Sequence, residues 1–375
     1  MKTRVKNSKL SSAGRLLPAS ALRLLLLVAP LSLSHGQEQG AASGAKDRLN
    51  LKNEFALFES EELLDVSLEF DLKTFLRKHP KTGYQQAVLA IRISDTDTVA
   101  RKVRIRPRGQ YRREVCSFPP VMVNFKKQLP AYSDTGKINK LKLVTHCQPG
   151  KISDENVLRE YLVYKLYNVL TDTSFRVRLL RMSYIDAART RKTIEQYGFF
   201  IEPDEIMALR TGSALVKSAS LTQKMIVPSN MDRVAIFFYM ISQWDWSVPG
   251  LHNIAVIIPP GHASSGKGIT VPYDFDLTGI VNPSYGFPDE KMGISSNRDR
   301  LYSGLCRTRE EFIHALEEFR VLKENFYSVV NDFPYLDQRA KKDITGFLDQ
   351  FFSQLNTPRE MERLVQQFMK TCKPL

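Results

Sequence analysis

The alternation of apolar and polar residues between Val66 and His146 constrains the fold more than any other feature of this sequence. The alternation is clearest in VSLEFDL, QAVLAIRIS and RKVRIRPRG, and it continues through PVMVNFKK and KLKLVTH. A two-residue period predicts strands that bury one face, because successive side chains of a strand point to opposite sides. We therefore expect the chain from Asn53 onward to begin with a β-sheet.

The pattern changes to helical spacing in SDENVLREYLVYKLYNVL, where Ser153 is the expected N-cap. Strands return in RVRLLRMSYIDA and EQYGFFIEPDE. The rest of the chain is mainly helical, with an N-cap signal at Ser229 or Asn230 before an apolar helix and three more helices between Arg307 and Lys373. The segments HNIAVIIPP and GITVPYDFD predict a β-hairpin within this helical part.

This order of elements predicts an α+β fold with two lobes and a cleft where they meet. Residues 53–202 are expected to form a β-rich lobe with one helix. Residues 203–375 are expected to form a mainly helical lobe that contains the hairpin.

The first 36 residues have the layout of a secretory signal peptide, with a basic start, an apolar run and the small polar stretch SLSHG. The apolar run is shorter than the ~20 residues that span a bilayer, which favours cleavage after Gly36 over a membrane anchor. Residues 37–52 are small and polar and predict a linker. We therefore expect an exported protein of the periplasm, the cell envelope or the medium, with no transmembrane span after cleavage.

The net charge points to an anionic partner. The whole chain carries +14, and removing the six basic residues of the expected signal peptide leaves about +8. A nucleotide, an acidic protein or an anionic envelope surface would match this charge. A nucleic-acid or polyanion binder would also match it, but the sequence has no nucleic-acid recognition motif, and export argues against that partner.

Four cysteines in an exported chain permit two disulfides with three possible connectivities. We favour Cys116 with Cys147 and Cys306 with Cys372, because each pair falls within one structural half. Four reduced, buried cysteines are the alternative. The spacings do not fit a zinc site.

The segment GHASSGKG, which starts at Gly261, nearly matches the phosphate-loop pattern of nucleotide-binding proteins. Gly268 stands where a Ser or Thr hydroxyl should hold Mg²⁺. The following ITVPYDFD has β-branched residues and a proline where that motif needs a helix. We therefore interpret this segment as a turn between paired strands.

Acidic and amide side chains flank this turn on both sides. Asp245 and Asn253 precede it in QWDWSVPGLHN, and Asp274 and Asp276 follow it in VPYDFDLTG. If Asp274 and Asp276 continue a strand, both carboxylates project to one side, where they need a cation such as Mg²⁺ or Mn²⁺. An aspartate, then an asparagine, then a hairpin ending in Asp-Phe is the order in which protein kinases carry their base and metal ligands.

Four segments of the chain are also similar to segments of a known family. They are RIRPRGQYRREVCSFPPVMVNFKK, ENVLREYLVYKLYNVL, YGFFIEPDEI, and WDWSVPGLHN with VPYDFDLTG. They resemble the CotH-type (spore-coat CotH) atypical protein kinases over most of residues 55–285. The resemblance implies a two-lobed protein-kinase-like fold that transfers the γ-phosphoryl group of ATP to Ser or Thr hydroxyls of a protein, with Mg²⁺ or Mn²⁺.

The resemblance also implies catalytic and metal-binding roles. Asp245 would orient or deprotonate the acceptor hydroxyl, and Asn253 and Asp274 would bind the metal. Asp276 would be a second carboxylate ligand or a helix N-cap. A cap at Asp245 and a turn amide at Asn253 are the structural alternatives, and we interpret the neighbouring His252 as structural.

Four further residues would bind the nucleotide. Lys142 would pair with Glu160 to fix the α- and β-phosphates. Lys126 competes with Lys142 for that role, and a solvated strand lysine is the structural alternative. Arg108 would form a turn over the phosphates, and Glu202 would lie where the adenine is read or would simply be exposed. Two tryptophans near the site, Trp244 and Trp246, are expected in the core.

Two other interpretations of the function stay open. The chain could be a catalytically inactive protein that binds partners or helps to assemble the envelope. It could instead phosphorylate a sugar or a lipid, because the chemistry of the site would be the same. The sequence does not identify the acceptor.

Overall fold

The computed structural model describes residues 56–78, 83–133, 136–217, 220–262 and 265–374. The expected signal peptide at 1–36 and linker at 37–52 lie outside these residues. All described residues belong to the compact unit that begins at Leu49.

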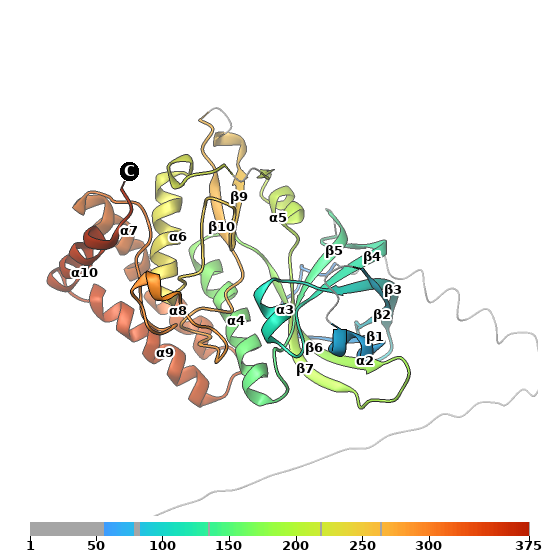
Figure 1. The fold of residues 1–375 in the computed structure, drawn as a ribbon. Coiled ribbons are helices and arrows are strands. Elements are labelled where there is room, and N and C mark those ends of the chain that lie inside the picture. The colour runs from blue at the N-terminus through green and yellow to red at the C-terminus, as the bar shows by residue number, and fades with distance from the viewer. Residues whose placement is uncertain (1–55, 79–82, 134–135, 218–219, 263–264, 375) are drawn as a thin grey trace, which may run out of the picture. The chain divides into compact units, whose positions relative to one another are not determined.

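A closed barrel of seven strands forms the first part of this unit (Figure 1). Its strands are β1 (Leu64–Phe70), β2 (Gln85–Arg92), β3 (Thr98–Pro107), β4 (Val121–Pro130), β5 (Lys137–Val144), β6 (Val177–Asp186) and β7 (Ile194–Ile201). Around the barrel the order is β1, β2, β3, β4, β5, β7 and β6. All neighbours run antiparallel except β6 and β1, whose parallel pairing closes the barrel.

The two-residue alternation of the sequence fills the barrel interior. In β1 every second residue is buried, and the same holds for Val103 and Ile105 of β3 and for Leu141 and Leu143 of β5. The short helices α2 (Leu72–Lys78) and α3 (Tyr111–Val115) accompany the barrel strands. The predicted strands of this region are confirmed.

The helix α4 (Lys151–Leu170) lies between the barrel and the helical part of the molecule (Figure 1). Tyr161 packs against the ring of Phe199 in β7, while Tyr167 packs against Phe237 of the helical part. Because α4 has partners on several sides, its apolar residues extend around most of the helix. The helix begins at Lys151, so the expected N-cap at Ser153 is wrong; the Ser153 hydroxyl instead accepts a hydrogen bond from the Gln148 N–H.

The second part surrounds the apolar helix α6 (Pro228–Ile241). A small sheet pairs β8 (Ala214–Val216), β9 (Ile254–Ile258) and β10 (Ile269–Pro272). The other helices are α5 (Asp204–Arg210), α7 (Arg309–Val321), α8 (Lys323–Asn331), α9 (Gln338–Phe352) and α10 (Pro358–Thr371). Short 3₁₀ turns are η1 (Gln223–Met225), η2 (Pro260–His262), η3 (Glu290–Met292) and η4 (Ser353–Leu355).

Several local predictions hold in this part, and others need correction. The hairpin of β9 and β10 is confirmed, and it joins a third strand, β8, that the sequence did not predict. The cap of α6 is Val227 rather than Ser229 or Asn230, because Pro228 opens the helix. The chain turns at Leu322, so the C-terminal region has four helices in place of the expected three.

The expectation of an α+β, two-lobed, protein-kinase-like fold is wrong. The first seven strands form a closed barrel and not an open β-rich lobe, because β6 returns to pair with β1. Three helices accompany those strands instead of one. The period-two pattern identifies the inward face of each strand, but it is the same in an open sheet and in a barrel.

Both predicted disulfides are present, Cys116 with Cys147 and Cys306 with Cys372. Two disulfides are consistent with an oxidising, exported location. Within the described ranges, no helix combines the length and the apolar character needed to cross a bilayer.

Removing the Cys306–Cys372 disulfide is expected to destabilise the protein. The bond closes a loop of 66 residues and fastens the end of α10, where the Cys306 N–H also donates to the Lys373 carbonyl. We expect the double variant Cys306→Ser/Cys372→Ser to lose about 2–4 kcal/mol in the free energy of unfolding, measured with urea. A loss equal to zero within error would contradict a stabilising role.

The buried His146 is expected to make stability depend on pH. Burial, and then the nearby charge of Arg112, lower the pKa of His146 to about 4, and its ring packs against Phe118 and Tyr184. Between about pH 6.5 and 4 the unfolded chain binds a proton at this site that the folded chain does not, so stability falls as the pH falls.

The variant His146→Phe should remove this pH dependence. We expect the wild type to lose up to about 3 kcal/mol more than the variant between pH 7.5 and 4.5 in urea denaturation. Other groups titrate equally in both proteins, so the difference between the two curves is the measurement. Parallel curves would show that His146 titrates normally.

Candidate functional site

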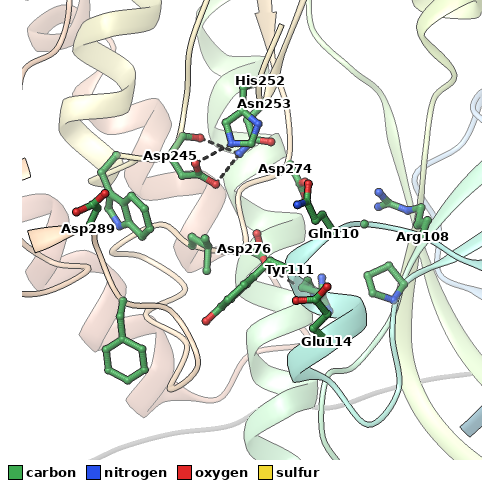
Figure 2. A pocket seen from close by; sticks show the side chains of 16 residues that line it. Arg108, Gln110, Tyr111, Glu114, Asp245, His252, Asn253, Asp274, Asp276 and Asp289 are labelled. Carbon is green, nitrogen blue, oxygen red and sulfur yellow. Dashed lines mark hydrogen bonds and ion pairs between the residues drawn. The ribbon is translucent and has the colours of Figure 1, made fainter. Parts of the chain in front are cut away.

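A cavity of about 490 Å³ contains most of the predicted site residues. One wall is the segment from Arg108 to Glu114, and the others come from the loops after α6, before β9 and after β10. Five of the eight predicted residues line it: Arg108, Asp245, Asn253, Asp274 and Asp276. Figure 2 shows Arg108 and Asp289 at opposite sides of the view, with Asp245, Asn253 and Asp274 between them.

Asp245 is held by two neighbours from the loop before β9. The Asn253 side-chain nitrogen donates to the Asp245 carbonyl over 2.7 Å and to its carboxylate Oδ2 over 3.2 Å. The His252 Nε2 lies 2.7 Å from the Asp245 Oδ1, and this hydrogen bond raises the pKa of His252. Because its nitrogen is engaged with Asp245, Asn253 has its amide oxygen left to accept a ligand.

Asp274 has a strained backbone that two hydrogen bonds fix in place. β10 ends at Pro272, so Asp274 does not continue the strand as expected, and its φ of +63° is left-handed. Its N–H donates to the Tyr164 hydroxyl over 2.9 Å, and its carbonyl accepts from Gln243 over 3.0 Å. The next residue, Phe275, is fully buried against Tyr164. Strain that is maintained by neighbours in this way is typical of functional sites.

A buried guanidinium lies among the acidic residues of the cavity. Arg112 of α3 is 7% exposed, with its Nη1 3.5 Å from Glu160 of α4 and its Nε 3.8 Å from Asp276. Its Nη2 donates to the carbonyl of Thr145. The Tyr285 hydroxyl donates to the Asp276 carboxylate over 3.3 Å. One cation therefore faces two buried carboxylates.

The buried carboxylates lack positive charge. Burial, together with the charge of Asp274, raises the pKa of Asp276 to about 6. Burial raises the pKa of Glu160 well above its usual range, although Arg112 opposes this shift. Burial lowers the pKa of Arg112, but the acidic groups around it more than reverse this, so the pKa is raised. An additional cation in the cavity would relieve the excess of negative charge.

The donor set of the cavity fits a hard divalent cation. Asn253, Asp274 and Asp276 offer an amide oxygen and two carboxylates, which are ligands that Mg²⁺ and Mn²⁺ accept. Among the residues that the structure describes, no three His, Cys, Asp or Glu side chains gather into a metal-binding group. A metal at this place would therefore need oxygen ligands from a bound phosphate or from water as well.

The expected ion pair of Lys142 and Glu160 does not form. Lys142 points out of the barrel, because the alternation of β5 sends its neighbours inward, and its Nζ lies 2.9 Å from Asp204 at the start of α5. Glu160 pairs instead with Arg112. The competing candidate Lys126 is exposed on β4. The cation that pairs with Glu160 therefore comes from the short helix α3 beside the barrel, and not from a barrel strand.

Glu202 is neither exposed nor part of the cavity, the two arrangements expected from the sequence. It is fully buried, and its carboxylate accepts hydrogen bonds from Tyr132 at 2.6 Å, from Arg210 at 3.0 Å and from the Arg176 N–H at 3.0 Å. These donors satisfy the carboxylate, which is not part of the cavity lining. The side chain of Glu202 therefore holds α5 to the barrel.

Two residues of the cavity were not recognised from the sequence. His252, which the sequence indicates only as structural, binds the Asp245 carboxylate. Arg112 could not be distinguished from the other arginines of RGQYRREV by spacing, although Cys116 in the same segment predicted a disulfide that fixes α3. Trp244 lines the cavity and is not in the core, whereas Trp246 is buried as expected.

Comparison with known proteins does not identify a family for this chain. No model of a known family matches the chain, and no curated protein matches it. Among solved structures the chain is similar to the crystal structure of a Helicobacter pylori proinflammatory kinase, CtkA, with 8% identity and a TM-score of 0.35 over 67% of this chain and 90% of that one. A TM-score this low does not establish a shared fold, and the match names a kinase but not the CotH-type family.

Breaking the buried cluster at Arg112 should be costly. The variant Arg112→Met leaves the carboxylates of Glu160 and Asp276 without their cation, and we expect a loss of about 3–5 kcal/mol in urea unfolding at pH 7. The double variant Arg112→Met/Glu160→Gln removes one of the unpaired charges and should recover part of this loss. Equal stabilities for the two variants would mean that Glu160 is not charged against Arg112.

Proposed function

We propose that this protein transfers the γ-phosphoryl group of ATP to a Ser or Thr hydroxyl of another protein, with Mg²⁺ or Mn²⁺. The observation that carries the proposal is the grouping of Asp245, Asn253 and Asp274 in one cavity, with Arg108 on the same lining. A base, two oxygen ligands and a cation for phosphate are the parts that phosphoryl transfer requires.

The metal would be held by Asn253 and Asp274, with Asp276 as a further carboxylate. This assignment is supported by the engaged Asn253 nitrogen, which leaves its oxygen to coordinate, and by the raised pKa of Asp276. When bound, the divalent ion supplies positive charge for the phosphate oxygens of the nucleotide.

Asp245 is the group placed to act on the acceptor. Its carboxylate is oriented by His252 at Oδ1 and by Asn253 at Oδ2. A carboxylate fixed in this way can accept a hydrogen bond from an incoming hydroxyl and take its proton as the hydroxyl attacks. Positioning of the hydroxyl contributes more here than basicity, because the transition state for phosphoryl transfer is loose.

Arg108 would bind the phosphates of the nucleotide. It follows β3, where its N–H continues the ladder by donating to the Pro120 carbonyl over 2.8 Å. Gly109 beside it has a φ of +75°, a turn conformation that glycine adopts at no steric cost. The ladder bond and the turn direct this part of the chain toward the cavity, where a guanidinium can form paired hydrogen bonds with phosphate oxygens.

A second function, binding without catalysis, is favoured by one observation. Arg112 already lies 3.5 Å from Glu160 and 3.8 Å from Asp276, so part of the negative charge is compensated without a metal. A protein with this arrangement could keep the cavity for a partner and lack transfer activity.

Metal-dependent nucleotide binding and transfer separate the two functions. We expect ATP with Mn²⁺ to raise the melting temperature of the wild type, and Asp274→Asn to abolish the part of the shift that needs Mn²⁺. We expect Asp245→Asn to bind ATP and Mn²⁺ normally but to transfer labelled phosphate about a hundredfold more slowly to exported acceptor proteins.

Asp289→Asn is the matched control, because it removes a carboxylate from the same cavity without touching the proposed ligands. It should retain both the thermal shift and the transfer. No shift with ATP and Mn²⁺ in the wild type would exclude the proposed enzyme. A shift without transfer would favour the binding function.

A further inference from the structure

The outer face of the barrel carries a concentration of positive charge outside the cavity. The strands β2 to β5 contain ten Lys and Arg residues and no Asp or Glu; one of the ten, Arg101, shares the inward register of Val99 and Val103. Two of the ten, Arg92 and Lys142, form ion pairs with carboxylates that the structure describes, and the other eight form none with them. Such a one-sided face attracts an anionic partner.

Three arginines form a row that leads to the cavity. Arg104 and Arg106 lie on the outer face of β3, because Val103 and Ile105 between and before them are buried inside the barrel. Arg108 follows two residues later and lines the cavity. At the rise of about 3.3 Å per residue in a β-strand, the row from Arg104 to Arg108 is ~13 Å long.

The first two arginines are held in position by an aromatic ring. The guanidinium carbons of Arg104 and Arg106 lie 5.3 Å and 5.1 Å from the centre of the Tyr84 ring. Two like charges are thereby kept side by side without a carboxylate between them in the part of the chain described. The arrangement costs side-chain entropy and repulsion in the free protein, and an anionic partner would offset both.

The face also extends across the sheet. Arg104 is in register with Asn124 of β4, and Asn124 with Lys140 of β5, so Arg104 and Lys140 share the outer face two strands apart. At the usual strand spacing this makes the face ~10 Å wide at that row. Its dimensions suit a polymer rather than one small anion.

We infer that this face, formed by Arg104, Arg106 and Lys140 and continued by Arg108, binds an extended acidic segment of a partner protein. Carboxylates on alternate residues of an extended segment have the same spacing as alternate arginines on β3, so their charges match in register. The inference is independent of phosphoryl transfer. It adds that a segment bound here reaches the edge of the cavity.

Other polyanions fit the face less well. Binding of single-stranded nucleic acid relies on aromatic rings that stack with bases, and the Tyr84 ring already faces two guanidiniums. Binding to a lipid surface relies on exposed large apolar side chains, and on the outer face of β2 and β3 the exposed one is Val88.

The test uses fluorescence anisotropy with a labelled twelve-residue peptide of alternating Glu and Ser, without nucleotide or metal. We expect the wild type to bind it, and the same peptide with Gln in place of Glu to bind at least about tenfold more weakly. The double variant Arg104→Gln/Arg106→Gln should weaken binding of the acidic peptide about tenfold. Binding of the wild type should fall as salt rises, because Lys140 is exposed and Arg104 and Arg106 are partly exposed to solvent.

The matched control is Arg181→Gln/Arg320→Gln, which removes the same charge from exposed arginines elsewhere on the molecule. We expect a change of less than about twofold. Equal losses in the two double variants would overturn the inference, because they would show attraction by net charge alone. Tighter Arg104- and Arg106-dependent binding of an oligonucleotide or of phosphatidylglycerol vesicles would also overturn it.

A last comparison separates this inference from the proposed function. Asp274→Asn should bind the peptide as the wild type does, even though it is expected to lose metal-dependent ATP binding. A cooperative thermal unfolding transition of the Arg104→Gln/Arg106→Gln variant would establish that it is folded. If this folded variant binds the peptide like the wild type, the assignment of the face is wrong.

Discussion

The contact of Arg112 with Glu160 and Asp276 is the interaction on which the arrangement of the site depends. Arg112 comes from α3 beside the barrel, Glu160 from the central helix α4, and Asp276 from the loop after β10. Burying a charge is favourable only when partners in good positions compensate it, so these three segments can approach one another only together. One guanidinium therefore positions α3, the loop after β10 and the central helix α4 relative to one another.

The sequence could predict the site residues whose partners are close in the chain, and not those whose partners are distant. Asp245 and Asn253 are eight residues apart and hydrogen-bonded, and the β9–β10 hairpin brings the chain back to Asp274. Short-range geometry of this kind follows from turn and strand patterns. The partners of Lys142 and Glu202 depend on where α5 meets the barrel, and nothing in their local spacing encodes this. Residues whose role is set by the contact between α5 and the barrel therefore escaped prediction.

The same difference between local patterns and distant contacts decides which parts of the fold the sequence predicts. Alternation predicted the barrel strands and their inward faces, and the cysteine positions predicted both disulfides. The parallel pairing of β1 with β6 joins residues more than a hundred positions apart and leaves no trace in the period of either strand. An open sheet and a closed barrel thus have equal support in the sequence, and the protein-kinase-like lobe was the wrong choice between them.

The charges of the cavity differ from those of the strands beside it, and this difference has a consequence for binding. The cavity lining includes the carboxylates of Asp274 and Asp276, and Glu160 is buried against Arg112 next to them, while the adjoining strands β2 to β5 contain cations and no acidic residue. An anion would be attracted to the strands and to Arg108, and repelled by the carboxylates of Asp274 and Asp276. A cation bound at these carboxylates, as proposed above, would reduce that repulsion, so that an anionic ligand would extend more readily from the barrel face into the cavity. The proposed metal site would in this way favour the entry of an anion into the cavity.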